Sequence, residues 1–236
     1  MPRIIVACES SQTVAKAFHA KGWDVTSVDI LPKDNPSNVE HVQSDIFEYL
    51  DWAVQNQSTD LLIGFPPCTD LSTIGVAHFH KKGYRKISKR YPAGVVPNSP
   101  MAQGLQFFRK LYYDYRNFIP SICLENPQGV IGTRLPNHSR LWNPINAKGI
   151  SHISYGLKKT QTIQPFEFGY PWSKKTFLWH NLPLLVGTHL VPVDPKYDNW
   201  INKLPNSTNE IGDRWKVRSK LCQGFGLAMA DQWGDL

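Results

Sequence analysis

A cysteine comes directly after a segment that the sequence predicts to be a buried strand. The apolar run 61–64 ends in a glycine and is followed by Pro66, Pro67 and Cys68. An apolar run bounded by such residues is typical of a parallel strand buried on both faces. Open α/β sheets bind their ligands at the carboxyl ends of these strands, and the two prolines fix φ and hold the thiol there. Cys68 is therefore a candidate nucleophile, although the local sequence fits an incidental small residue equally well.

A carboxylate follows a second strand-like run in the same way. Residues 119–124 lead into Glu125, Asn126 and Pro127. The proline keeps the residue before it out of a helix, so we expect Glu125 at a strand-to-loop junction, on the same edge of the sheet as Cys68. A thiol and a carboxyl group at adjacent strand ends can attack a conjugated ring and protonate it elsewhere. Taken alone, a glutamate after a strand is more commonly a helix cap or an ion-pair partner.

The amino-terminal segment predicts a βαβ unit. A buried strand over residues 3–8 leads into the polar turn 9–12. The apolar spacing that follows predicts a helix over 13–21, which Gly22 closes. The run 24–28 then predicts a second strand.

Two acidic residues follow the strands of this region. Asp29 comes about twenty positions beyond the first turn, where Rossmann-type folds bind a ribose hydroxyl. Asp45 follows a third strand-like segment. A G-x-G-x-x-G sequence is not found, and a turn without those glycines suits a cofactor that has no pyrophosphate. The alternative is a plain α/β scaffold in which Asp29 and Asp45 cap helices.

The motifs around Cys68 and Glu125 resemble those of a known family. Pro66-Pro67-Cys68 and Glu125-Asn126-Pro127 are similar, in order and separation, to the Pro-Cys and Glu-Asn motifs of the C5-cytosine DNA methyltransferases. Longer segments resemble a compact phage and prophage branch of that family, and these segments are 6–11, 168–171, 174–179, 213–219 and 228–234. The resemblance extends from residue 3 to residue 234.

The resemblance implies a fold and a reaction. The fold would be α/β, a Rossmann-like S-adenosylmethionine-dependent methyltransferase fold with a mostly parallel sheet and helices on both faces, in one catalytic domain over residues 1–236. Cys68 would add to C6 of cytosine in DNA. Glu125 would bind and protonate the ring at N3, which makes C5 nucleophilic toward a methyl sulfonium. Such enzymes extrude the target base from the duplex, because C5 and C6 cannot both be approached inside the stack.

The implied cofactor is S-adenosyl-L-methionine. Asp29 would hold its ribose hydroxyls and Asp45 its adenine amino group. The complete set of expected cofactor-binding residues is Cys8, Glu9, Ser10, Asp29, Ile30, Asp45, Ile46 and Pro66. Pro67, Asn126 and Pro127 would contact the substrate, with Asn126 and Pro66 shaping the pocket.

The chain departs from the family pattern in three places. The Phe-x-Gly-x-Gly turn of the larger enzymes is replaced by Cys8-Glu9-Ser10-Ser11, a form that the compact branch shares. The Gln-x-Arg-x-Arg motif is not found, and Lys174 is our candidate for its charge and a third catalytic residue. Only about forty residues separate Trp179 from Arg218, where the larger enzymes place a target-recognition domain.

Charge gives a second indication of a polyanionic partner. The net charge of +7 and the pI near 9.2 occur in many proteins with no nucleic-acid role. The location of the cationic residues is more informative, because six of the ten residues 81–90 are cationic and lie soon after Cys68. We expect segment 75–98 to be a basic loop that contacts DNA phosphates, through Lys81, Lys82, Arg85, Lys86 and Arg90. The alternative is a solvated surface loop.

Two further segments leave the substrate open. Segments 134–160 and 186–213 are rich in loop-forming residues and are either minimal recognition elements or surface padding. The small size also fits a C5-pyrimidine methyltransferase that acts on a free nucleotide or on RNA. A third alternative is an inactive, methyltransferase-like nucleic-acid-binding protein, but the presence of both Cys68 and Glu125 counts against it.

The remaining features bound the class of protein. The 4 cysteines form no C-x-x-C pair, a usage that suits a reducing compartment. His78 and His80 have no further ligands at zinc-like spacing, so no metal is expected. No apolar stretch approaches membrane-spanning length, and the chain shows no signal peptide. We expect a cytoplasmic protein of a bacterium or of a phage-infected cell.

Overall fold

The computed structural model describes residues 1–34, 36–72, 100–129, 131, 157–196 and 222–235. The predicted basic loop 75–98 lies outside the described residues. Of the two loop-rich segments, only 157–160 and 186–196 are described.

A seven-stranded sheet forms the centre of the described structure, in the order β3-β2-β1-β4-β5-β7-β6. Strand β7 runs antiparallel to both of its neighbours, and the other pairings are parallel. The strands are β1 (Arg3–Ala7), β2 (Asp24–Asp29), β3 (Glu40–Gln43), β4 (Leu61–Gly64), β5 (Ser121–Pro127), β6 (Gln161–Ile163) and β7 (Thr176–His180). The order is that of a Rossmann sheet with an antiparallel strand inserted before its last member. The predicted α/β fold with a Rossmann-like, mostly parallel sheet is confirmed.

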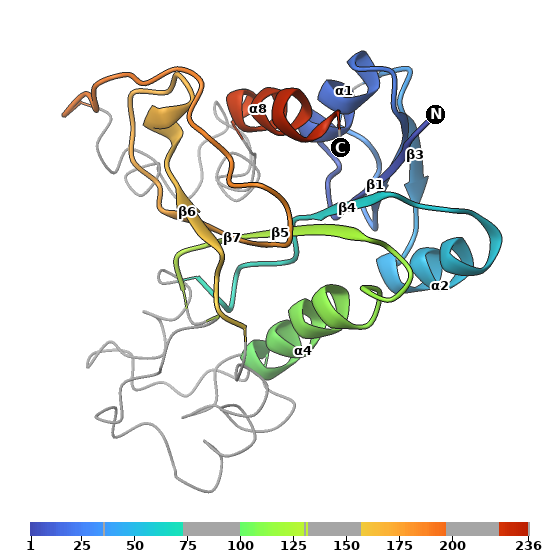
Figure 1. Cartoon of the computed structure of the whole chain (residues 1–236). Coiled ribbons are helices and arrows are strands. Elements are labelled where there is room, and N and C mark those ends of the chain that lie inside the picture. The colour runs from blue at the N-terminus through green and yellow to red at the C-terminus, as the bar shows by residue number, and fades with distance from the viewer. Residues whose placement is uncertain (35, 73–99, 130, 132–156, 197–221, 236) are drawn as a thin grey trace, which may run out of the picture.

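Helices cover both faces of this sheet (Figure 1). Helices α1 (Thr13–Ala20) and α8 (Gln223–Trp233) lie on one face, and α2 (Ile46–Asn56) and α4 (Pro100–Tyr113) lie on the other. A short 3-10 helix, η1 (Pro165–Glu167), follows β6.

Side chains alternate between the two faces along each central strand. In β1, Ile4 and Val6 pack with α1 and α8, whereas Ile5 and Ala7 pack with α2 and α4. All four are fully buried. A strand covered on both faces reads as a continuous apolar run, which is why β1 and β4 are visible in the sequence.

Helix α8 packs closely on α1 and on the η1 turn. A Cβ at Gly224 would lie 2.3 Å from the Phe168 carbonyl oxygen, so glycine is needed for this approach. The indole of Trp23 donates to the Gly234 carbonyl at 2.9 Å, and Lys21 pairs with Asp231 at 2.6 Å.

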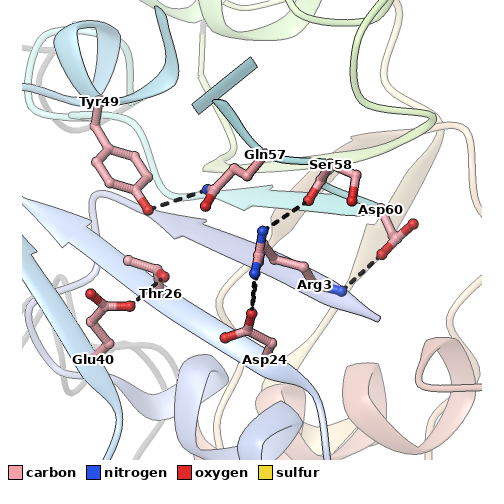
Figure 2. A network of polar contacts seen from close by, with 8 residues as sticks. All are labelled: Arg3, Asp24, Thr26, Glu40, Tyr49, Gln57, Ser58 and Asp60. Carbon is pink, nitrogen blue, oxygen red and sulfur yellow. Dashed lines mark hydrogen bonds and ion pairs between the residues drawn. The ribbon is translucent and has the colours of Figure 1, made fainter. Parts of the chain in front are cut away.

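A polar network fastens the amino-terminal ends of the strands (Figure 2). The Arg3 guanidinium contacts the Asp24 carboxylate at 2.7 Å, and the Arg3 backbone N–H donates to Asp60 at 2.8 Å. Asp24 begins β2 and Asp60 precedes β4, so Arg3 ties three neighbouring strands together. This network lies at the edge of the sheet opposite to the strand ends that carry the candidate site residues.

Element boundaries differ little from the expected ones. Gly22 follows α1 with φ of 83°, the left-handed conformation that favours glycine after a helix. Helix α4 ends at Tyr113, because the chain then tightens into turns with bonds from Arg116 N to Tyr113 O and from Phe118 N to Tyr115 O. Strand β5 extends to Pro127 because β7 pairs with its last residues.

Phe225 and Leu227 offer a direct test of the α8 packing. Phe225 is 2% exposed and makes an edge-on contact with Phe168, whereas Leu227 on the same helix is 50% exposed. We expect Phe225→Ala to lower the free energy of unfolding by about 3–5 kcal/mol through the cavity that it leaves. Leu227→Ala should change it by less than about 1 kcal/mol. Urea denaturation measures both, and equal losses would contradict the packing described.

Candidate active site

The register of the sheet brings four strand ends to one level. Val28 pairs with Ala7, Ala7 with Gly64, and Gly64 with Leu124. The residue that follows each of these four positions is, in order across the sheet, Asp29, Cys8, Phe65 and Glu125. The expectation that Glu125 and the segment leading to Cys68 share one edge is therefore confirmed at the level of the backbone.

A cavity of about 400 Å³ opens at this edge. It contains the candidate nucleophile and acid together with the acidic strand ends. Its lining residues are Cys8, Glu9, Ser10, Ser11, Asp29, Ile30, Leu31, Asp34, Ser44, Asp45, Ile46, Phe65, Pro66, Pro67, Cys68, Thr69, Phe107, Glu125, Pro127 and Lys174. Every expected cofactor-binding residue and all three expected catalytic residues lie in this lining.

Cys8 turns the chain from β1 into the cavity. It was expected inside the first strand, but the strand ends at Ala7 and Cys8 adopts a left-handed φ of 59°. Its backbone N–H donates to the Val28 carbonyl at 2.7 Å, which fixes the turn to the end of β2. Burial, and then the charges of Asp29 and Asp45, raise the pKa of the Cys8 thiol, so this thiol stays protonated.

Asp29 and Asp45 carry carboxylates at the ends of β2 and β3. Asp29 Oδ1 accepts a bond from the Leu31 N–H at 2.9 Å. Asp45 caps α2, where its Oδ1 accepts from the Phe47 and Glu48 N–H groups at 2.8 and 3.3 Å. The capping alternative is thus correct for Asp45, and it does not remove this residue from the cavity lining.

Glu9 is buried beneath the start of α1 and is 5% exposed. Its two carboxyl oxygens accept from the backbone N–H groups of Val14 and Ala15 at 2.9 and 3.2 Å. Ser11 donates its hydroxyl to the same carboxyl group. Burial raises the pKa of Glu9 to about 7, and the hydrogen bonds from the helix partly offset that effect.

Glu125 and Lys174 also line the cavity. Glu125 is 8% exposed and pairs in register with Leu178 of β7. Burial raises its pKa to about 7, whereas the ammonium of Lys174 lowers it. The thiol of Cys222 is close to both groups. Burial raises its pKa to about 11, while the charge of Lys174 lowers this pKa and that of Glu125 raises it. A carboxyl group with such a pKa can donate a proton near neutral pH.

The loop that carries Cys68 is held against the loop that follows β5. The N–H groups of Leu71 and Ser72 both donate to the Cys68 carbonyl, at 3.0 and 2.9 Å. Ser72 then forms an antiparallel bridge with Gly129. This bridge joins the thiol-bearing loop to the strand that carries Glu125.

Asn126 lies on the other face of β5 from Glu125. It is completely buried, pairs with Phe177 in the register, and is absent from the cavity lining. Within the described part of the chain, neither its amide nitrogen nor its amide oxygen has a hydrogen-bond partner. Its neighbour Pro127 does line the cavity. Asn126 therefore does not line the described cavity, whereas Glu125 and Pro127 on either side of it do.

Some lining residues carried no recognisable signal in the sequence. Asp34 reaches the cavity from the loop after β2, where its backbone N–H donates to the Ser10 carbonyl at 2.9 Å. Phe107 reaches it from α4 and packs against Phe47 with ring centroids 4.7 Å apart. Loop closure places Asp34, and helix docking places Phe107, so neither follows from local spacing.

Lys81, Lys82, Arg85, Lys86 and Arg90 lie outside the described residues. In the described part of the chain, no group of three or more His, Cys, Asp or Glu side chains is arranged to hold a metal ion. None of the described helices combines the length and the apolar character needed to cross a membrane.

Several solved structures are similar to this chain at low sequence identity. A variant of DNMT2 from Spodoptera frugiperda has a TM-score of 0.41 and 15% identity, over 83% of this chain and 56% of its own. The protein WbdD, bound to a kinase inhibitor, has a TM-score of 0.36 and 14% identity over 81% of this chain and 39% of its own. A second structure of WbdD is described as that of a bifunctional kinase-methyltransferase. It has a TM-score of 0.37 and 13% identity, over 81% of this chain and 37% of its own.

The chain thus spans about half the length of DNMT2 and less than two fifths of WbdD. No protein-family model and no curated protein matches it. What this chain does has to follow from its own residues.

Gly129 tests the bridge between the loop that carries Cys68 and the loop that follows β5. A Cβ at this position would lie 1.8 Å from the Leu71 carbonyl oxygen, so Gly129→Ala has to push the Cys68 loop away. We expect Cys68 in the native protein to react several-fold faster with a thiol reagent, measured by mass spectrometry. Gly104→Ala is the matched control, because its added methyl would meet only the Leu71 side chain, at 3.2–3.4 Å. Unchanged labelling of Cys68 in Gly129→Ala would argue against this role of the bridge.

The raised pKa of Glu125 predicts a pH-dependent stability. Between its ordinary value of 4.5 and about 7, the folded protein binds a proton that the unfolded chain has released. The free energy of unfolding therefore falls as the pH rises through this window, by about 3 kcal/mol at most from this group.

Glu125→Gln should make the stability loss between about pH 5 and about pH 8 smaller than in the wild type. Urea denaturation at the two pH values measures it. Glu48→Gln, an exposed glutamate at the start of α2, is the control and should keep the wild-type loss. An equal loss in Glu125→Gln would mean that the carboxyl group is already ionised at low pH.

Proposed function

We propose that this chain is an S-adenosylmethionine-dependent methyltransferase that methylates C5 of cytosine in DNA through a covalent Cys68 adduct. The observation that carries the proposal is the shared cavity. Cys68 and Glu125 lie more than fifty residues apart in the sequence and line one cavity with the acidic residues Asp29 and Asp45 at neighbouring strand ends. This combination supplies a nucleophile, an acid and a nucleoside-binding edge in the same place.

The donor set of the cavity fits S-adenosylmethionine. Carboxylates at Asp29 and Asp45 can accept from ribose hydroxyls and from an adenine amino group. The apolar lining residues Ile30, Ile46 and Phe65 can cover the faces of the adenine ring. When bound, this cofactor supplies an electrophilic methyl group on a cationic sulfur.

The chain's own residues would perform the activation of the ring. The Cys68 sulfur forms a bond to C6, and the electron pair displaced from the C5–C6 double bond is stabilised when Glu125 gives its proton to N3. C5 thereby becomes nucleophilic and accepts the methyl group. Loss of the C5 proton to a base, return of the N3 proton and departure of the Cys68 thiolate then restore the aromatic ring.

Lys174 sets the acidity of Glu125 in this scheme. Burial alone favours a carboxyl group that holds its proton tightly, and the adjacent ammonium opposes that effect. The two influences leave a group that is protonated in part at neutral pH and can still release its proton. We propose this as the role of Lys174, in place of the missing arginines.

DNA is the proposed substrate because of the cationic segment 81–90 close after Cys68 in the sequence. A base in a duplex has to leave the stack before Cys68 and the methyl donor can approach opposite faces of its ring. Cytosine in RNA and a free pyrimidine nucleotide would pass through the same chemistry. The substrate experiment below separates the three.

Methyl transfer from labelled S-adenosylmethionine ranks these substrates. We expect label in duplex DNA and little in RNA or dCMP. DNA containing 5-fluorocytosine should form a stable covalent adduct with the wild-type protein, since fluorine at C5 cannot leave as a proton does. Cys68→Ser should abolish the adduct, and Glu125→Gln should slow methyl transfer by about 10²–10⁴-fold.

Cys222→Ser is the control for the trapping experiment, because Cys222 is a second half-buried cysteine near Glu125. It should still form the adduct. Label in dCMP but not in DNA would replace DNA by a nucleotide substrate. An adduct in Cys68→Ser as strong as in the wild type would reject Cys68 as the nucleophile.

A further inference from the structure

Glu9 occupies the position at which Rossmann folds receive a phosphate. In those folds the pyrophosphate sits on the N-terminus of the first helix, where backbone N–H groups point at it. Here the N–H groups of Val14 and Ala15, in the first turn of α1, donate instead to the two carboxyl oxygens of Glu9 at 2.9 and 3.2 Å. The protein has placed its own anion in this position.

The orientation of a bound nucleoside makes this substitution matter. Rossmann-like folds hold the ribose at the end of the second strand, which in this chain is Asp29. Asp29 and Glu9 line the same cavity. A group attached to the 5′ carbon of a ribose held at Asp29 therefore lies toward the start of α1, next to Glu9.

We infer that Glu9 is a selectivity residue, which excludes adenine cofactors that carry a phosphate on the 5′ carbon and leaves the site to adenine nucleosides with a neutral or cationic 5′ substituent. The inference rests on the proposed function and deepens it. It explains in physical terms why the turn after β1 needs no G-x-G-x-x-G sequence. With no phosphate to receive, the backbone does not have to approach a pyrophosphate, and the space is taken by a side chain.

The charges of the residues that line the cavity also favour a cationic ligand over a phosphate. Asp29, Asp34 and Asp45 add further carboxylates to the lining of the cavity that contains Glu9. Among the described lining residues Lys174 alone is a lysine or arginine, and its charge acts on Glu125. A cationic sulfonium is favoured by such surroundings, whereas a phosphate is repelled.

Competition with S-adenosylmethionine tests the inference. Binding of S-adenosylmethionine is measured first by calorimetry, and adenosine and adenosine 5′-monophosphate are then used to displace it at about pH 8, where Glu9 is ionised. We expect the monophosphate to displace it at least about tenfold less well than adenosine. Glu9→Gln keeps the size of the side chain and one acceptor for α1. It should reduce the ratio of the displacement constants of the monophosphate and adenosine by about tenfold. Glu48→Gln removes a charge outside the cavity and should leave the ratio unchanged.

The outcomes separate the inference from the proposed function. A lack of S-adenosylmethionine binding to the wild type would overturn both. Binding with equal displacement by the two competitors would overturn the inference alone, and this comparison needs no variant. A ratio unchanged in folded Glu9→Gln would likewise overturn it, since a residue that only caps α1 would alter thermal stability and leave the preference between the two competitors as it is.

Discussion

The pairing of Val28 with Ala7, of Ala7 with Gly64 and of Gly64 with Leu124 holds four strand ends at one level. Everything proposed for the site depends on this register. A shift of one residue in a single strand would turn its side chains to the opposite face of the sheet, and Glu125 would then face the α4 side. The buried Ile, Leu and Val side chains on both faces resist such a shift, so the apolar core fixes the positions of polar groups that contribute little to it.

Two buried carboxyl groups, Glu9 and Glu125, have similar pKa values for different reasons. Burial raises both to about 7, but backbone N–H groups oppose it at Glu9 and the Lys174 ammonium opposes it at Glu125. The first arrangement is rigid, because the opposing groups belong to a helix. The second depends on a flexible side chain, which can follow a carboxyl group as its proton leaves. The cavity thus contains two carboxyl groups of similar pKa, one held by backbone N–H groups of a helix and the other next to a side-chain ammonium.

The strands and the thiol–carboxylate edge could be predicted from the sequence because central strands covered on both faces form continuous apolar runs. The residues after each run then lie at the ligand-binding edge, which accounts for Asp29, for Glu125 and, three positions beyond Phe65, for Cys68. Other features depend on contacts between distant segments. Asp34 enters the cavity through a bond to Ser10, and Asn126 is turned away from it by the pleat of β5. The end of α4 at Tyr113 is set by turns that the helical pattern does not reveal.

The contact between α1 and α8 affects the order in which parts of the molecule fold. Trp23 and Gly234 are hydrogen-bonded across 211 positions of the chain, and Phe18 shares its core with Phe225 and Trp233. Contacts between such distant segments form late, because the intervening chain has to be ordered first. During synthesis, α1 therefore remains without its apolar partner until the α8 segment has emerged. The segment from Phe18 to Trp23 therefore reaches its final packing only after the α8 segment has joined it.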